Sequence, residues 1–238
     1  MTTLLSTTNL SVRYGSLLAI DNANILVSNK DFVGVIGPNG GGKSTLVKAL
    51  VGLINPYKGK IEKAKDLKIG YVPQVNNIDF KFPISVEEVI NFGIYSKIQR
   101  RMDRQRIDLV MKQMGIAGLQ KRPIGELSGG QRQRVYICRA VIGNPELLIL
   151  DEPNTYVDNK FESEMYDLLR ELNKTMAIML VSHDVGTVYK NVKSIFCVNK
   201  HVHIHDSPQS YLDSISNCSS DLSFVEHKNI NVKILENH

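Results

Sequence analysis

"GPNGGGKST", Gly37 to Thr45, decides the fold of this chain. Gly37 to Ser44 fit the pattern G-x-x-x-x-G-K-[ST], and they stand between the β-branched run "FVGVIG" and a helical pattern. Glycines let successive backbone N–H groups turn toward phosphate oxygens, and the start of a helix adds a favourable dipole. The stretch therefore predicts a strand, a phosphate-binding loop and a helix. A glycine-rich turn that binds nothing is the plain alternative.

The same pattern assigns roles to individual side chains. We expect Lys43 to reach the β- and γ-phosphates of a nucleotide, and the Ser44 hydroxyl to ligate Mg²⁺. The residues expected to line the nucleotide phosphates are Gly37, Pro38, Asn39, Gly40, Gly41, Gly42, Lys43, Ser44 and Thr45.

An acidic pair follows the apolar run "ELLIL". We expect Asp151 to take a direct or water-mediated place on Mg²⁺, and Glu152 to orient and deprotonate the water that attacks the γ-phosphate. Taken alone, such a pair is more often a charge pair at a helix N-terminus. Its combination with the phosphate loop favours catalysis.

Three further residues have both a structural and a functional interpretation. His183 in "LVSHD" is either a satisfied structural histidine or a sensor that hydrogen-bonds the γ-phosphate. Gln74 in "YVPQ" is either a solvated strand end or a contact to Mg²⁺ and the attacking water. Tyr14 either packs in the core or stacks on adenine, an interaction worth about 1–3 kcal/mol.

A second candidate phosphate-binding site is "LSGGQ", Leu127 to Gln131. Ser128 and the backbone amides of Gly129 and Gly130 open a helical pattern, which makes an anion site. Nothing in the same chain needs this site if Lys43 already binds the phosphates. The chain therefore carries two candidate phosphate-binding sites, which is more than one bound nucleotide requires.

The order of patterns predicts an α/β fold. The first thirty residues read as antiparallel strands, and the apolar runs "ELLILDEP" and "AIMLVSHD" read as buried parallel strands. Residues 86–140 read as a helical insert, and "SIFCVNKHVHIHD" as a hairpin. We expect one domain over 1–215, with residues after Ser207 irregular and an extension at 216–238 that is partly disordered.

Composition excludes several classes of protein. The chain has 238 residues, of which 42% are hydrophobic and 22% charged, with a net charge of +5. Its three cysteines are far apart, so we expect reduced thiols rather than disulfides or a zinc module. Neither a signal peptide nor an apolar run of about 20 residues is present, so any membrane contact is expected to come through a partner.

Together these motifs resemble an ATP-binding cassette (ABC) ATPase over residues 4 to about 215. The resemblance is carried by Tyr14, "GPNGGGKST", Gln74, "LSGGQ", "LLILDEP" and His183, in that order. It implies a P-loop core with a parallel sheet, an antiparallel β subdomain and an inserted helical subdomain. It also implies ATP and Mg²⁺ as cofactors, and a head-to-tail homodimer in which Ser128, Gly129, Gly130 and Gln131 bind the γ-phosphate held by the other subunit.

One branch of that family fits better than the others. "IGYVPQVNNIDFKFPISVEEVINFGIY" and "CVNKHVHIHDSPQ" are similar to the zinc, manganese and iron importers. The resemblance implies a cytoplasmic subunit held on the inner face of the membrane by permease subunits, and served indirectly by an extracytoplasmic metal-binding protein. Importers of iron chelates or other small solutes are the near alternative.

Two other functional classes are less well supported. ABC ATPases that act on nucleic acid or ribosomes usually carry a long coiled coil or tandem cassettes, and we expect no nucleic-acid partner here. A regulatory ATP-binding subunit without turnover is disfavoured by Glu152 and His183. The basic run "SKIQRRMDRQR" has no interleaved aromatic residues and reads as a solvated helix face.

Three features depart from the family or add to it. Gly41 replaces a residue that usually has a side chain, which predicts a slightly looser loop. In "NTYVD", Asp158 matches the family's loop aspartate and is a candidate nucleotide contact, but Tyr156 is bulkier than expected. His201, His203 and His205 alternate and could bind a second metal on one strand face, although a solvated or partner-facing strand is the better interpretation.

Overall fold

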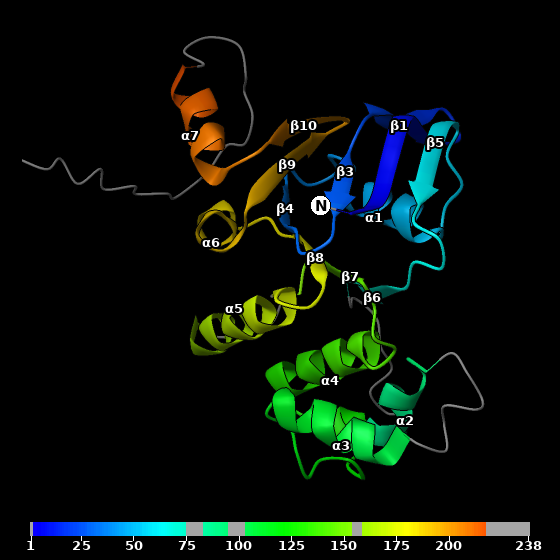
Figure 1. Cartoon of the computed structure of the whole chain (residues 1–238), viewed down its shortest axis with the longest axis vertical. Coiled ribbons are helices and arrows are strands. Elements are labelled where there is room, and N and C mark those ends of the chain that lie inside the picture. Colours follow the sequence, from blue (N-terminus) through cyan, green and yellow to red (C-terminus); the bar gives the residue numbers. More distant parts are fainter. Residues whose placement is uncertain (1, 75–82, 95–102, 154–158, 218–238) are drawn as a thin grey trace, which may run out of the picture.

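The computed structural model describes residues 2–74, 83–94, 103–153 and 159–217. Their strands form a four-stranded antiparallel sheet and a six-stranded, mostly parallel sheet. Figure 1 shows the antiparallel sheet at one end of the molecule, a group of helices at the other and the parallel sheet between them.

The antiparallel sheet is built around one long strand. Its order is β2-β1-β3, and β5 also pairs with β1, over Leu5 to Ser11. The strands are β1 (Thr3–Tyr14), β2 (Leu17–Ala23), β3 (Leu26–Ser28) and β5 (Lys58–Lys63). The antiparallel strands predicted within the first thirty residues are confirmed as β1, β2 and β3. The sequence reading did not include β5, whose lysine-rich stretch is mostly exposed and shows little apolar alternation.

The six-stranded sheet has the order β10-β9-β4-β8-β7-β6. Only the hairpin that joins β9 to β10 is antiparallel, as the sequence predicted. The strands are β4 (Phe32–Ile36), β6 (Ile69–Val72), β7 (Leu147–Asp151), β8 (Ala177–Val181), β9 (Ser194–Asn199) and β10 (His201–His205). Because β4, β6, β7 and β8 are parallel, their carboxyl ends share one edge, where α/β folds place ligands.

Each face of this sheet belongs to a different hydrophobic core. Along β7, Leu147 and Ile149 pack with α1 and the antiparallel sheet, whereas Leu148 and Leu150 pack with α4 and α5. Successive side chains of a strand point to opposite faces, so a fully apolar run is what a sheet covered on both sides requires. The continuous apolar runs were therefore correctly assigned to buried parallel strands.

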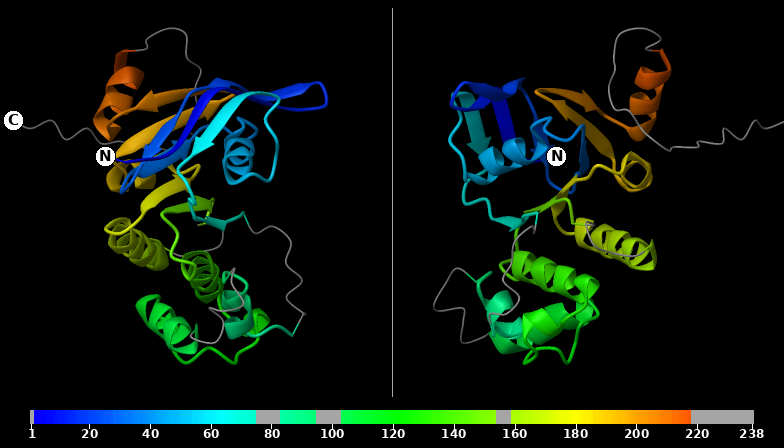
Figure 2. Two further views of the ribbon diagram at one scale, coloured as in Figure 1. Left: turned by 45° about the vertical axis from the view of Figure 1, so that its right-hand side comes forward. Right: turned by 180° about the vertical axis from the view of Figure 1, so that it is seen from behind.

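The helices occupy three places around the sheet. Helix α1 covers one face, α5 and α6 lie on the other, and α2, α3 and α4 form the group at the end opposite the antiparallel sheet in every view (Figure 2). The helices are α1 (Lys43–Val51), α2 (Val86–Asn91), α3 (Asp103–Gln113), the 3₁₀ helix η2 (Ile124–Glu126), α4 (Gly129–Val141), α5 (Asn159–Asn173), α6 (Val185–Asn191) and α7 (Pro208–Asn217). The helical character predicted for residues 86–140 is present in their described parts.

The prediction that residues after Ser207 are irregular is wrong for the first ten of them. Helix α7 begins at Pro208, and the Ser207 hydroxyl accepts a hydrogen bond from the backbone N–H of Ser210 at 3.1 Å. Serine before the helix and proline at its first position are a common helix start. Tyr211 buries its ring against the core and holds the helix in place.

Within the described residues, no helix combines the length and the apolar character that crossing a membrane requires.

Candidate active site

The phosphate loop connects β4 to α1 at the carboxyl edge of the parallel sheet. Helix α1 begins after Gly42, which has φ 100°, and no side chain caps its first amides. A side chain at position 42 would also place its Cβ atom 2.5 Å from the carbonyl oxygen of Ala19. The glycine thus permits the turn that leaves the helix amides available to an anion.

Lys43 lies folded back onto the loop that precedes it. Its side chain donates hydrogen bonds to the carbonyl oxygens of Gly37 at 2.9 Å and Pro38 at 3.0 Å. Burial lowers the pKa of Lys43, while the negative charges of Glu152 and Asp151 oppose that shift. The ammonium group therefore sits between the loop backbone and the acidic pair.

Gly41 has a packing role beyond the looser loop that the sequence predicted. Its carbonyl oxygen accepts a hydrogen bond from the N–H of Lys200, in the β9–β10 turn, at 2.8 Å. A Cβ atom at position 41 would lie 2.8 Å from the carbonyl oxygen of Val198. The missing side chain thus lets the hairpin approach the phosphate loop closely.

Asp151 is the last residue of β7 and is 1% exposed. Its Oδ1 atom accepts a hydrogen bond from the Ser44 hydroxyl at 3.1 Å. Burial and the neighbouring charge of Glu152 raise the pKa of Asp151, while the Ser44 hydrogen bond and the cations Lys48 and Lys43 act to lower it. The structure brings Ser44 and Asp151 together as predicted, although 107 positions separate them.

Glu152 has a left-handed backbone conformation, with φ 50°, which is uncommon for a residue with a long side chain. Its Oε2 atom accepts a hydrogen bond from the Gln74 side-chain nitrogen at 2.6 Å. Gln74 follows β6, which pairs with β7. The structure thus places Gln74 and Glu152, two of the predicted site residues, side by side.

A tyrosine that the sequence reading did not single out belongs to this cluster. Tyr71 lies in β6, and burial, together with the neighbouring charge of Asp151, raises the pKa of Tyr71 to about 12. In the sequence Tyr71 stands only three positions before Gln74. Tyr71 lies near Asp151 because β6 pairs with β7, and the sequence alone does not show this pairing.

His183 and Tyr14 lie at the margins of the cluster. His183 is exposed, two residues beyond Val181, which pairs with Asp151 across β7 and β8. Tyr14 ends β1 with 48% of its surface exposed, so it is not a core residue. Both positions leave the side chains accessible to a ligand.

The LSGGQ segment begins helix α4 as the sequence predicted. Ser128 is the N-cap: its hydroxyl accepts from the N–H of Gln131 at 3.2 Å, and Gln131 Oε1 accepts from the N–H of Ser128 at 3.1 Å. This capping box leaves the amides of Gly129 and Gly130 in the unpaired first turn of the helix. Helices α4 and α1 pack against opposite faces of the parallel sheet, so this helix start and the phosphate loop are separate sites on one chain.

The donor atoms at the acidic pair fit a magnesium ion. The Ser44 hydroxyl, the Asp151 carboxylate and the Gln74 amide carbonyl are hard oxygen ligands, and Mg²⁺ is bound in proteins by a few such groups with water and phosphate. Ser44 and Asp151 already contact one another, and Gln74 is held beside them through Glu152. These three residues are the candidates that would hold the ion.

The alternating histidines do not form a second metal site in the structure. No group of three or more His, Cys, Asp or Glu within the described chain is arranged to hold a metal ion. His201 Nδ1 lies 3.3 Å from the carbonyl oxygen of Asp21, and the His205 ring packs edge-on against Tyr211 with centroids 5.3 Å apart. The outer two histidines thus have separate partners.

We therefore expect the His201→Ala/His203→Ala variant to bind zinc with the same affinity as the wild type. The measurement is a calorimetric zinc titration of both proteins without nucleotide. Weaker zinc binding by the double variant would contradict this expectation and restore the histidine site.

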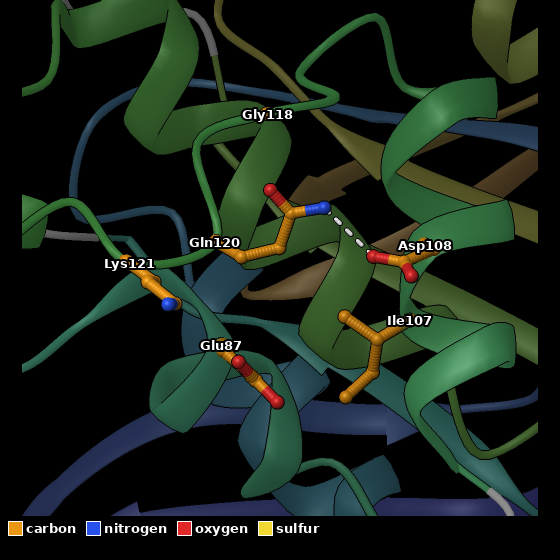
Figure 3. Close-up of a pocket in the computed structure, with 6 residues that line it drawn as sticks. All are labelled: Glu87, Ile107, Asp108, Gly118, Gln120 and Lys121. Carbon is orange, nitrogen blue, oxygen red and sulfur yellow. Dashed lines mark hydrogen bonds between the residues drawn. The ribbon is translucent and has the colours of Figure 1, made fainter.

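A pocket of about 430 Å³ lies away from the phosphate loop, between α2, α3 and the loop that follows α3 (Figure 3). Glu87, Asp108 and Gln120 line it, and Gln120 donates a hydrogen bond to Asp108 at 2.7 Å. Lys121 also lines the pocket, so two carboxylates stand beside one cation, a charge balance that suits a triphosphate poorly. We do not assign nucleotide binding to this pocket.

Some predicted features lie outside the described residues. They are the loop residues Tyr156 and Asp158, the basic run up to Met102, and the extension from residue 218 onward.

A phosphate loop between a strand and a helix, with an acidic pair at the end of a neighbouring parallel strand, defines a P-loop nucleotide-binding ATPase. The model of the ABC transporter family matches residues 20–155. The chain belongs to the ABC transporter family, and it is the ATP-hydrolysing type of subunit.

Individual relatives agree with this assignment. A "Probable metal transport system ATP-binding protein" of Thermotoga maritima is 40% identical, over 83% of this chain and 82% of that protein. A zinc uptake system ATP-binding protein, ZurA, of Listeria innocua is 38% identical over 89% and 88%. A solved ATP-binding cassette, in a dimeric post-hydrolysis state with ADP and Pi, is 25% identical with a TM-score of 0.71, over 85% of this chain and 98% of that one.

Proposed function

We propose that this chain binds ATP with Mg²⁺ at the phosphate loop, hydrolyses it, and thereby powers uptake of a divalent metal ion through a membrane permease. The cluster at the carboxyl edge of the sheet carries the ATPase part, because it joins Ser44 to Asp151 and Gln74 to Glu152. The metal cargo is supported by relatives that match most of this chain and are named as metal transport and zinc uptake ATP-binding proteins.

Each side chain of the site has its own role in ATP binding or hydrolysis. Lys43 exchanges its backbone carbonyl partners for the β- and γ-phosphates, and the open amides at the start of α1 bind the phosphate oxygens. Glu152 accepts the proton of the attacking water, and His183 hydrogen-bonds the γ-phosphate. Tyr14 stacks on the adenine ring.

Ser44, Asp151 and Gln74 would hold Mg²⁺. The ion, when bound, neutralises charge that develops on the β- and γ-phosphate oxygens. Gln74 would contribute its amide carbonyl oxygen, while its amide nitrogen donates to Glu152 at 2.6 Å, so one side chain can serve the ion and orient the Glu152 carboxylate.

The LSGGQ segment serves the other subunit of a head-to-tail homodimer. Its helix start and the phosphate loop are separated by the parallel sheet within one chain, so one chain does not close both around one nucleotide. A second chain, placed in the reverse direction, brings the amides of Gly129 and Gly130 to the γ-phosphate bound by Lys43. Gln131 and Asp158 complete this composite site. The dimeric form of the solved cassette that resembles this chain supports the arrangement.

The subunit works on the inner face of the membrane, held by permease subunits. An extracytoplasmic binding protein delivers the ion to the permease.

Metal uptake is tested by producing the chain with its permease and binding protein in a bacterium that lacks its own zinc and manganese importers. We expect several-fold greater accumulation of zinc, manganese or iron, measured by elemental mass spectrometry, and no increase with Lys43→Ala. Accumulation of an iron chelate or another solute, with none of these free ions, would overturn the metal assignment and leave the ATPase assignment intact.

A further inference from the structure

The turn between β9 and β10 packs directly against the phosphate loop. Strand β9 pairs with β4 as far as Ile36, the last residue before the loop, and then continues past the point where β4 ends. A Cβ atom at Gly41 would lie 2.8 Å from the carbonyl oxygen of Val198, and the N–H of Lys200 donates to the carbonyl oxygen of Gly41 at 2.8 Å. The phosphate loop therefore has a hydrogen-bonded neighbour on the side of the hairpin.

Lys200 is itself held from a second side. Its carbonyl oxygen accepts a hydrogen bond from the N–H of Asp21 in β2 at 2.7 Å, and His201 Nδ1 lies 3.3 Å from the Asp21 carbonyl oxygen. Both backbone polar groups of Lys200 are thus used, one toward the phosphate loop and one toward the antiparallel sheet. Lys200 makes these two contacts with a left-handed backbone, φ 61°, which is uncommon for a residue with a long side chain.

The hydrogen bond from Lys200 to Gly41 fixes the direction of one amide of the loop. A trans peptide points its C=O and the N–H that follows it in opposite directions. Because the Gly41 carbonyl oxygen is bound to the hairpin, the N–H of Gly42 points away from the hairpin. Gly42 is the N-cap of α1, so this N–H stands next to the open amides of the helix start.

We propose that Lys200 is a positioning residue, whose backbone holds the Gly41–Gly42 peptide in the orientation that presents the Gly42 N–H to the nucleotide phosphates. Two consecutive glycines have wide backbone freedom, and a loop that must lose this freedom when ATP binds has a lower affinity than a loop that is already ordered. The contact with Lys200 orders the peptide before ATP arrives. This inference rests on the proposed binding of ATP at the phosphate loop and adds to it a residue from a distant hairpin.

The test compares Lys200→Pro and Lys200→Gly with the wild type. Proline removes the N–H and cannot adopt a positive φ, whereas glycine keeps the N–H and adopts the left-handed backbone readily. We expect the affinity for a non-hydrolysable ATP analogue with Mg²⁺, measured by calorimetry, to fall about tenfold or more in Lys200→Pro, the usual effect of losing a hydrogen bond to a charged group. In Lys200→Gly the affinity should change less than about twofold, because the backbone contact is kept.

Steady-state kinetics separate a positioning role from a general loss of structure. In Lys200→Pro the KM for ATP should rise, while the turnover rate at saturating ATP stays within about threefold of the wild type, because the acidic pair is unchanged. A partly unfolded preparation would instead lower the turnover rate and leave the KM unchanged, and that result would reject the inference.

Lys30 offers a matched control. It is another exposed lysine with a left-handed backbone, φ 63°, and it precedes β4, at the end of that strand opposite the phosphate loop. Lys30→Pro should therefore disturb its own turn and leave the KM for ATP unchanged. An equal rise of the KM in Lys30→Pro and Lys200→Pro would show that any damaged turn weakens ATP binding, and would reject the inference.

A further variant keeps the test decisive if Lys200→Pro does not fold. Lys200→Val retains the N–H but disfavours the left-handed backbone, so we expect a smaller rise of the KM in the same direction. A wild-type KM in Lys200→Pro, or in Lys200→Val if proline is not tolerated, would overturn the role of Lys200 and leave the proposed ATP binding intact. A rise in Lys200→Gly as large as in the other variants would show that the lysine side chain acts, and would reject the backbone role. Absence of ATP binding in the wild type would overturn the proposed function itself.

Discussion

Replacing Glu152 with glutamine is expected to lower the ATP turnover rate by about 10²–10⁴-fold, the usual contribution of a general base. Glutamine has nearly the same shape, and its amide oxygen can still accept the hydrogen bond that Gln74 donates to Glu152. The amide cannot take the proton of the attacking water. ATP binding should survive, because Lys43 and the start of α1 are unchanged. Phosphate release measured at saturating ATP, together with equilibrium nucleotide binding, checks both parts.

The same variant should accumulate as an ATP-bound dimer, because hydrolysis no longer reopens it. Size-exclusion chromatography with and without ATP tests this expectation. Glu171→Gln is the matched control, since Glu171 is an exposed carboxylate that pairs with Lys174 on the surface. Near-wild-type turnover in Glu152→Gln would exclude Glu152 as the base. A loss of ATP binding equal to the loss of turnover would also contradict the assignment.

Ser128→Arg and Lys43→Ala should each abolish ATPase activity, and mixing the two proteins should restore part of it. In a head-to-tail dimer each composite site combines the Lys43 loop of one chain with the Ser128 segment of the other. A mixed dimer therefore has one site that carries both substitutions and one site that carries neither. If the sites act independently, an equal mixture should recover up to about one quarter of wild-type activity, because half of its dimers are mixed and each has one intact site. The measurement is ATPase activity with the permease present, after mixed dimers have been confirmed by differential tagging.

Ser128→Arg also removes a helix cap, which costs about 1 kcal/mol of stability, so a capping control is needed. Ser85 caps α2 with the same reciprocal contacts to Glu88 that Ser128 makes with Gln131. Ser85→Arg should therefore carry a similar loss of stability and keep most of its ATPase activity in the absence of permease. If mixing restores nothing despite confirmed mixed dimers, the shared-site account fails.

The sequence predicted the features that are encoded locally. The glycines and lysine of Gly37 to Ser44, between an apolar run and a helical pattern, favour a loop and a helix start, and the apolar run before Asp151 favours a buried strand. Ser128 followed three positions later by Gln131 is likewise a local helix signal. These elements agree with the structure because their causes lie within a few residues of one another.

Features that depend on distant contacts were not foreseen. Tyr71 lies near Asp151 only because β6 and β7 pair in one register. The reason for glycine at position 41 is the approach of the β9–β10 hairpin, about 160 positions later in the chain. The sequence left a metal site on the alternating histidines as the less favoured interpretation, and the separate neighbours of His201 and His205 became visible only in the structure.

The left-handed backbone at Glu152 has a geometric consequence for the acidic pair. In an uninterrupted strand, two consecutive side chains point to opposite faces, so one acid would enter the core packed by α5. β7 ends at Asp151, and at Glu152 the chain turns while its N–H still donates to the carbonyl oxygen of Val181 at 3.0 Å. Both carboxylates consequently act on the charge of Lys43. If the Asp-Glu pair stood one position earlier, both residues would lie within β7, and their side chains would point to opposite faces of the sheet. The two carboxylates would then not meet at one site.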